Sequence, residues 1–161
     1  MSAEINETVH RRYIEECWSD GDMDLQDQLV AEDVVDHNPF PGAPTGLEGR
    51  RVALRRMRSA FDIKTKIDLL LTDGDYVIGR WTAQFVHKGD FLGIPATGKQ
   101  ATITGIDICR YHDGKIAEMW HQENVMSLMQ QLGVVPTPTP SADHLAYDRT
   151  NSVSKREPPT A

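Results

Sequence analysis

The sequence predicts an α+β domain in which helices come first and a curved antiparallel sheet follows. Over residues 4–60, apolar side chains recur every three to four positions, which is typical of amphipathic helices. Over residues 63–124 they recur at every second position, which indicates strands. The length of 161 residues suits one domain with a single core. We therefore expect a folded domain over residues 1–133 and a polar, proline-rich tail over residues 134–161, either disordered or a strap across a partner subunit.

Three helices are expected in the first part of the chain. The first covers about residues 4–19, and the short second helix follows Asp22, its expected N-cap. An extended piece over residues 34–41 then runs into a loop of prolines and glycine. The third helix extends over residues 45–60. Its basic side is expected to be a solvated face, formed by Arg50, Arg51, Arg55, Arg56 and Arg58.

Four strands are expected after the helices, each antiparallel to the one before it. They cover residues 63–71, 76–87, 99–111 and 115–124. One face of the first strand is expected to carry Ile63, Thr65, Ile67, Leu69 and Leu71. Asp113-Gly114 is a strong signal for a two-residue hairpin between the last two strands. A closing helix is expected over residues 125–132, with Gly133 as its end.

A sheet of this size can wrap around a pair of helices and leave a cone that is open at one end. The large side chains expected to line this cone are Tyr13, Trp18, Phe61, Trp81, Phe85 and Met119. They could bind an apolar ligand, or they could simply fill the core.

One carboxyl group interrupts a strand face that is otherwise small or apolar. Asp107 lies on that face of the strand over residues 101–109, where an unpaired carboxylate is costly to bury. Counting back from the hairpin at residues 113–114, His121 lies opposite Asp107. Cross-strand partners on one face have Cβ atoms about 4.5–5.5 Å apart, so the two side chains could form a hydrogen bond. Such a carboxylate would raise the pKa of the imidazole and orient it as a general base. The pair could instead be a satisfied core pair with no catalytic role.

Two further polar residues are candidates for the pocket. His37 follows the extended piece and could lie at the rim of the pocket, or it could be an ordinary loop histidine. Glu123 lies two residues beyond His121 on the same strand face, as a third pocket group or a solvated strand end.

Charge and motifs exclude several functions. The net charge of −7 argues against binding to nucleic acid and to anionic membranes. The N-terminus lacks the basic start and apolar stretch of a secretory signal, so we expect a cytoplasmic protein. Cys17 and Cys109 are expected to be buried, reduced thiols. Because dinucleotide, phosphate-loop and zinc motifs are absent, the sequence predicts no cofactor and no metal.

Several segments follow one another in a recognisable order. They are VVDHNPFPG, GLEG, TDGDYVIGRW, GIPATGK, DGKIAEMWHQEN and LMQQLG. This series, which spans about Ile5 to Gly133, resembles the SnoaL-like polyketide cyclase (ester cyclase) family of the NTF2-like superfamily. The resemblance implies an NTF2-like α+β cone that assembles as a homodimer or homotetramer. It also implies a small apolar or aromatic, polyketide-like substrate and no cofactor.

The resemblance also implies where the chemistry takes place. In these cyclases an acid–base pair on the two strands flanking the hairpin removes a proton next to a carbonyl. The resulting enolate then closes a ring by intramolecular aldol addition. The matching positions here are Asp107 and His121, but the two residue types are exchanged between the strands, since the residue after Trp120 is the histidine. Gly105 stands where such cyclases often have a polar pocket residue.

Two classes of function follow from these features. The first is a cofactor-independent acid–base enzyme, such as a polyketide cyclase or an isomerase. In it His121 is the base, and Asp107 orients it or donates a proton. The second is a protein that binds a small molecule in the same pocket without converting it. The superfamily also contains dehydratases and epoxide hydrolases, so an isomerase, lyase or hydrolase reaction is a further alternative.

Overall fold

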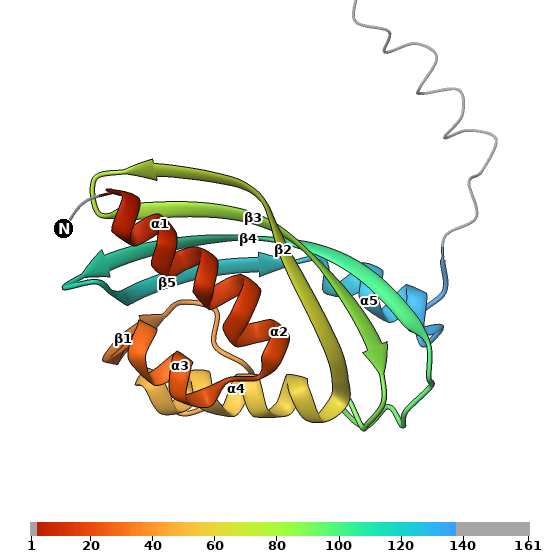
Figure 1. Cartoon of the computed structure of the whole chain (residues 1–161). Coiled ribbons are helices and arrows are strands. Elements are labelled where there is room, and N and C mark those ends of the chain that lie inside the picture. Colours follow the sequence, from red (N-terminus) through yellow and green to blue (C-terminus); the bar gives the residue numbers. More distant parts are fainter. Residues whose placement is uncertain (1–2, 138–161) are drawn as a thin grey trace, which may run out of the picture.

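A strongly curved sheet and the helices inside its curve determine where the candidate site lies. The computed structural model describes residues 3–137, and its five strands form one sheet in the order β1-β5-β4-β3-β2. The sheet bends over α1, α3 and α4, while α5 lies against β4 at the far end (Figure 1). The strands are β1 (Val30–Asp36), β2 (Phe61–Asp73), β3 (Tyr76–His87), β4 (Gln100–His112) and β5 (Lys115–Glu123). The helices are α1 (Ala3–Arg12), α2 (Trp18–Asp20), α3 (Met23–Leu29), α4 (Gly46–Ala60) and α5 (Val125–Leu132).

The first expected helix is not continuous. A π-helical turn over Tyr13–Cys17, η1, separates α1 from α2. In this turn the Ile14 carbonyl accepts a hydrogen bond from the Thr65 hydroxyl of β2. Such turns often occur at functional sites. Here the turn places the buried Tyr13 side chain in the space beneath the sheet.

The predicted ends of two other helices are confirmed. Asp22 is the N-cap of α3, where its Oδ1 accepts a hydrogen bond of 2.8 Å from the backbone N–H of Leu25. α5 ends at Leu132, and Gly133 follows it with a φ of 81°, the left-handed conformation that glycine adopts without strain.

The sheet has one strand more than the sequence predicts. Residues 34–36 belong to β1, which lies parallel to β5 and pairs Asp36 with Met119. The prediction of a four-stranded meander is therefore wrong at this edge. Parallel strands far apart in the sequence have no hairpin turn between them, so no local signal announces the pairing. The extra strand brings Asp36 next to the strand that carries His121.

The prediction that five alternate residues share one face of β2 is only partly correct. Ile63 and Ile67 are buried as expected, but Leu69 and Leu71 are 50% and 55% exposed on the outer face. A bulge between Ile67 and Leu69 shifts the register against β3 and turns Leu70 inward instead. One extra residue in a strand reverses the alternation of all that follow it.

Other sequence-based expectations concern the core, the membrane and the tail. Cys17 and Cys109 are buried free cysteines, as expected. Within residues 3–137, no helix combines the length and the apolar character needed to cross a bilayer. Most of the expected tail, residues 138–161, lies outside the described residues, so the division into domain and tail stays a prediction.

Candidate functional site

A cavity of about 330 Å³ lies between the curved sheet and the helices. Its wall comes from β2–β5, from η1, α2 and α4, from the loops after β1 and β3, and from α5. Most of the wall is apolar, and its apolar side chains include Phe40, Met57, Phe91, Leu92, Ile103 and Leu128. Its polar side chains include Asn38, Arg50, Asp107, His121 and Glu123. A largely apolar cavity with a few convergent polar groups is typical of a small-molecule site.

The structure brings most of the predicted pocket residues to this cavity, with two exceptions. Those that line it are Tyr13, Trp18, Trp81, Phe85, Met119, Glu123, Asp107 and His121. Phe61 is fully buried but lies behind the wall, edge-on to Phe85, with 5.2 Å between the ring centroids. His37 does not reach the cavity. Its ring stacks on Trp120, with the centroids 4.5 Å apart, and its Nε2 lies 2.9 Å from Glu118. The expectation of a rim position for His37 is therefore wrong, because its side chain packs on the opposite face of β5.

Arg50 departs most from the sequence prediction. It was expected on the solvated face of its helix, but its side chain is only 5% exposed. Its Nη1 donates to Asp36 Oδ2 at 2.7 Å, and its Nη2 and Nε donate to the Tyr13 hydroxyl at 2.8 Å and 3.2 Å. Burial raises the pKa of Tyr13, so its hydroxyl stays neutral and can accept both bonds. A buried guanidinium needs such partners, since an unpaired buried charge is strongly destabilising.

His121 is held between two carboxylates. Its Nδ1 lies 2.6 Å from Glu123 Oε1, and its Nε2 lies 3.1 Å from Asp36 Oδ1. Both contacts are hydrogen bonds when each ring nitrogen carries a proton. Burial by itself would lower the pKa of His121, but the bonds to Asp36 and Glu123 outweigh it and raise the pKa to about 9. The imidazole is therefore positively charged at neutral pH, although the Arg50 guanidinium beside it acts in the opposite direction.

Asp36 and Asn38 connect this cluster to the loop after β1. Burial would raise the pKa of Asp36, but the hydrogen bond with His121 and the charge of Arg50 hold it well below its usual range. Asn38 donates its backbone N–H to Asp36 Oδ1 at 2.9 Å and accepts the backbone N–H of His121 at 3.0 Å. The loop therefore fixes both partners of the ion pair.

Asp107 occupies the position that the hairpin count predicts. It lies directly opposite His121 in the register of β4 and β5, as expected. The expected hydrogen bond between the two side chains is replaced by the bonds of His121 to Asp36 and Glu123. Asp107 is 4% exposed, and burial raises its pKa to about 6, although the Trp81 indole and the charge of His121 partly oppose this rise. A buried carboxylate beside a cation can accept a proton near neutral pH, and the cation can stabilise nearby negative charge.

Comparison with known proteins identifies the family. The model of the family described as SnoaL-like polyketide cyclase matches residues 8–132. The chain belongs to this family. Among curated protein sequences, none matches it.

Several solved structures share the fold. TsrD from Streptomyces laurentii is 28% identical with a TM-score of 0.77, over 84% of this chain and 99% of that one. A Bacillus cereus protein with a provisional assignment as a polyketide cyclase is 31% identical with a TM-score of 0.72, over 84% and 87%. IdmH from Streptomyces antibioticus, with the same provisional assignment, is 28% identical with a TM-score of 0.70, over 81% and 99%. These similarities support the NTF2-like fold that the sequence predicts.

Sequence reasoning missed two charged residues of this SnoaL-like site, Arg50 and Asp36. One signal could have found Arg50, because it lies three residues after Leu47 and four before Leu54, on the buried face of α4. Asp36 carries no comparable signal, since its role depends on the parallel pairing of β1 with β5.

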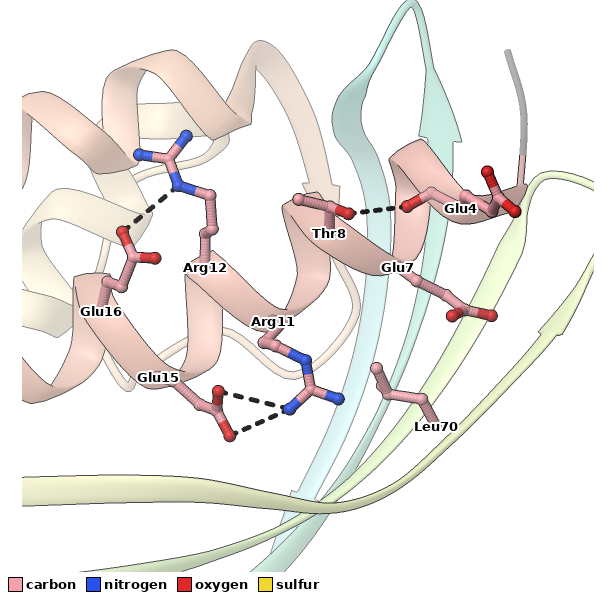
Figure 2. Close-up of a pocket in the computed structure, with 8 residues that line it drawn as sticks. All are labelled: Glu4, Glu7, Thr8, Arg11, Arg12, Glu15, Glu16 and Leu70. Carbon is pink, nitrogen blue, oxygen red and sulfur yellow. Dashed lines mark hydrogen bonds and ion pairs between the residues drawn. The ribbon is translucent and has the colours of Figure 1, made fainter.

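A second hollow on this protein is polar and open, and contrasts with the cavity (Figure 2). It follows the exposed side of α1 and η1, where Arg11 pairs with Glu15 and Arg12 with Glu16, both at 3.2 Å. Leu70 is its apolar contribution. Exposed ion pairs one helical turn apart contribute little to the free energy of folding, so we interpret this surface as an ordinary solvated face of the helix. Over residues 3–137, no group of three or more His, Cys, Asp or Glu side chains is placed to hold a metal ion.

Proposed function

We propose that this protein is an acid–base enzyme that removes a proton next to a carbonyl group of a small, largely apolar, polyketide-like compound. The single observation that carries the proposal is the buried Asp107 carboxyl, which faces a mostly apolar cavity opposite a positively charged histidine. The family assignment to SnoaL-like polyketide cyclases supports the substrate class and ring closure by intramolecular aldol addition.

Asp107 is the better candidate for the base. With a pKa of about 6 it is ionised at neutral pH, yet it is a stronger base than an aspartate in water. His121 was expected to be the base from the sequence alone. A ring whose two nitrogens both donate protons to carboxylates has no free lone pair, so we assign the base to Asp107 instead.

The positive charge of His121 then stabilises the enolate that forms. When Asp107 takes the proton from carbon, negative charge develops on the carbonyl oxygen. The imidazolium and Arg50 lie on the same side of the cavity and can stabilise that charge in a space from which apolar walls exclude water. The enolate carbon attacks a second carbonyl of the same molecule, one C–C bond forms, and the new alkoxide takes the proton back from Asp107. Every atom is retained, and the reaction needs no oxidant or cofactor.

The direct test uses 2-tetralone, a bicyclic ketone with acidic C–H bonds next to its carbonyl. In D2O the protein should accelerate exchange of these protons for deuterium, followed by NMR. Asp107→Asn should reduce the accelerated rate by about 10²–10⁴-fold, the usual contribution of a general base. Asp62→Asn, which alters a surface pair with Lys88 instead, is the matched control and should exchange like the wild type.

Three results discriminate the alternatives. Full exchange by Asp107→Asn would show that Asp107 is not the base. Binding of 2-tetralone without any exchange by the wild type would favour the binding-protein alternative. If the assignment holds, exchange should rise through about pH 6, where Asp107 ionises, and fall through about pH 9, where His121 loses its charge.

A further inference from the structure

We infer that the indole N–H of Trp81 is the neutral donor that binds the carbonyl oxygen of the substrate beside Asp107. The inference rests on the proposed function in one respect, that a carbonyl compound occupies the cavity. It adds the group that recognises the carbonyl oxygen, and therefore a rule for which compounds the cavity selects.

Trp81 is buried and its nitrogen lacks a partner. The residue is 8% exposed, and Nε1 has no hydrogen-bond partner among the described residues. Four other residues of the described chain have buried polar side-chain atoms without a partner, and none of the four lines the cavity. A buried donor without an acceptor is destabilising, so an acceptor supplied by a ligand gains more here than in water.

The cationic groups of the site already have acceptors. Arg50 donates to Asp36 and to Tyr13, and both ring nitrogens of His121 face carboxylate oxygens. They supply charge to the cavity, while three of the five N–H bonds of Arg50 and both ring N–H bonds of His121 are already directed at acceptors of the protein. Trp81 retains an N–H that a ligand oxygen can use.

Gly105 fixes where this N–H lies. Trp81 pairs with Gly105 across β3 and β4, and a Cβ at Gly105 would stand 2.2 Å from Trp81 Cζ2 and 2.7 Å from Cε2, the atom bonded to Nε1. The indole therefore lies flat over β4 at Gly105, where any side chain would displace it. Asp107 lies two residues further along the same face, near enough for the indole N–H to lower the Asp107 pKa although the two groups form no hydrogen bond of normal geometry, which places the N–H on the Asp107 side.

This arrangement explains why a glycine stands at position 105, since any larger residue would collide with the indole. The neighbouring strand supplies a polar group at this point of the wall, as an indole N–H that reaches across the glycine. An N–H next to the carboxylate base can hold a carbonyl oxygen while the adjacent C–H bond points toward that base, as proton removal requires. The cavity should therefore prefer a flat apolar skeleton that carries a ketone over the same skeleton without oxygen.

The test compares 2-tetralone with tetralin, which has the same bicyclic skeleton and no carbonyl. Wild-type protein should bind 2-tetralone more tightly, and Trp81→Phe should lose about two- to tenfold of that preference, as for one hydrogen bond. The smaller phenyl ring changes the packing against the shared skeleton of both compounds alike, so the ratio of the two affinities reports the lost N–H. Trp120→Phe is the matched control, because Trp120 stacks on His37 and its neighbours Met119 and His121, not Trp120, line the cavity. It should alter neither affinity.

A second readout does not depend on how Trp81→Phe folds. In spectra of the wild-type protein labelled with ¹⁵N, the Trp81 indole N–H signal should shift downfield with 2-tetralone and not with tetralin. The signal is assigned by elimination with Trp18→Phe and Trp120→Phe. Gly105→Ala keeps the N–H but displaces the ring, so it should reduce the preference for the ketone as Trp81→Phe does.

The outcomes separate this inference from the proposed function. An unchanged preference for the ketone in Trp81→Phe, or an unshifted Trp81 signal, would overturn the inference even where Asp107→Asn abolishes exchange. A preference that depends on Trp81 without any proton exchange would keep the inference and overturn the enzyme. If the wild type binds neither compound, the cavity does not take bicyclic ketones, and the inference is wrong.

Discussion

Two histidines of this protein, one fully buried and the other 12% exposed in its side chain, are held in opposite charge states. His121 lies between Asp36 and Glu123, and its pKa is raised to about 9. His10 on α1 is fully buried, with its Nδ1 3.0 Å from the Tyr111 hydroxyl and its Nε2 without a partner among the described residues. Burial, helped by the charge of Arg11, lowers the pKa of His10 to about 4.

The difference teaches that burial alone does not decide what a histidine can do. Removal from water favours the neutral ring in both regions, and only His121 has carboxylates that reverse the effect. His10 packs so closely on β3 that a Cβ at Gly79 would stand 2.3 Å from its Nε2, which leaves no room for a carboxylate there. His121 therefore carries a positive charge beside the cavity, whereas His10 is a neutral part of the core.

Removal of the Asp36 carboxylate should cause the largest loss of stability among these variants. Asp36→Asn leaves the buried Arg50 and His121 with one anion fewer, so the free energy of unfolding should fall by about 3–5 kcal/mol, as for other broken buried ion pairs. Urea denaturation measures this loss. The matched control is Asp27→Asn, because Asp27 on α3 pairs with Arg51 on α4 and both side chains are about one-third exposed, so the change should have little effect. Equal losses in the two variants would contradict the buried ion pair.

The neutral state of His10 should make the stability of the protein depend on pH in the acid range. The unfolded chain protonates His10 near the ordinary histidine pKa of 6.5 and the folded chain near 4, so stability is lost as pH falls between these values. From pH 7 to pH 4, this linkage costs the wild type about 3 kcal/mol. His10→Asn removes it, so the variant should lose about that much less stability over the same range. Denaturation curves at both pH values measure the difference, and parallel losses in the two proteins would show that His10 is not held neutral.

Two tyrosine hydroxyls give the smallest and most closely matched comparison. Tyr13 accepts hydrogen bonds from the charged Arg50, whereas the Tyr111 hydroxyl contacts the neutral His10. Because hydrogen bonds to charged groups are stronger, Tyr13→Phe should cost about 2 kcal/mol and Tyr111→Phe about 1 kcal/mol. Urea denaturation of both variants at pH 7 measures this order. A larger loss in Tyr111→Phe than in Tyr13→Phe would contradict a charged hydrogen-bond partner at Tyr13 and a neutral one at Tyr111.

The sequence predicts these two regions unequally, for physical reasons. The Asp113-Gly114 turn fixes the register of β4 and β5, so simple counting places Asp107 opposite His121. Asp36 enters the site through a parallel strand without a hairpin, and Leu69 leaves the inner face through a bulge, neither of which a local pattern reveals.

The surroundings of two charged side chains, Arg50 and His121, were also predicted incorrectly from the sequence. The five arginines of α4 indicate a solvated face by composition, but Arg50, which is in phase with Leu47 and Leu54, is buried and the other four are not. His121 was expected to pair with the carboxylate across the strand. Its partners are Glu123 on the same strand and Asp36 on β1, and those contacts raise its pKa and are the reason why we propose Asp107 as the base.

The most direct test of the account is an NMR titration of the histidine side chains in the intact protein. His121 should stay doubly protonated at pH 7.5, with both ring nitrogens carrying hydrogen, and should lose a proton near pH 9. His10 should stay neutral in the same sample down to about pH 4. A His121 that is already neutral at pH 7.5 would contradict the charged cluster and return the role of base to the histidine.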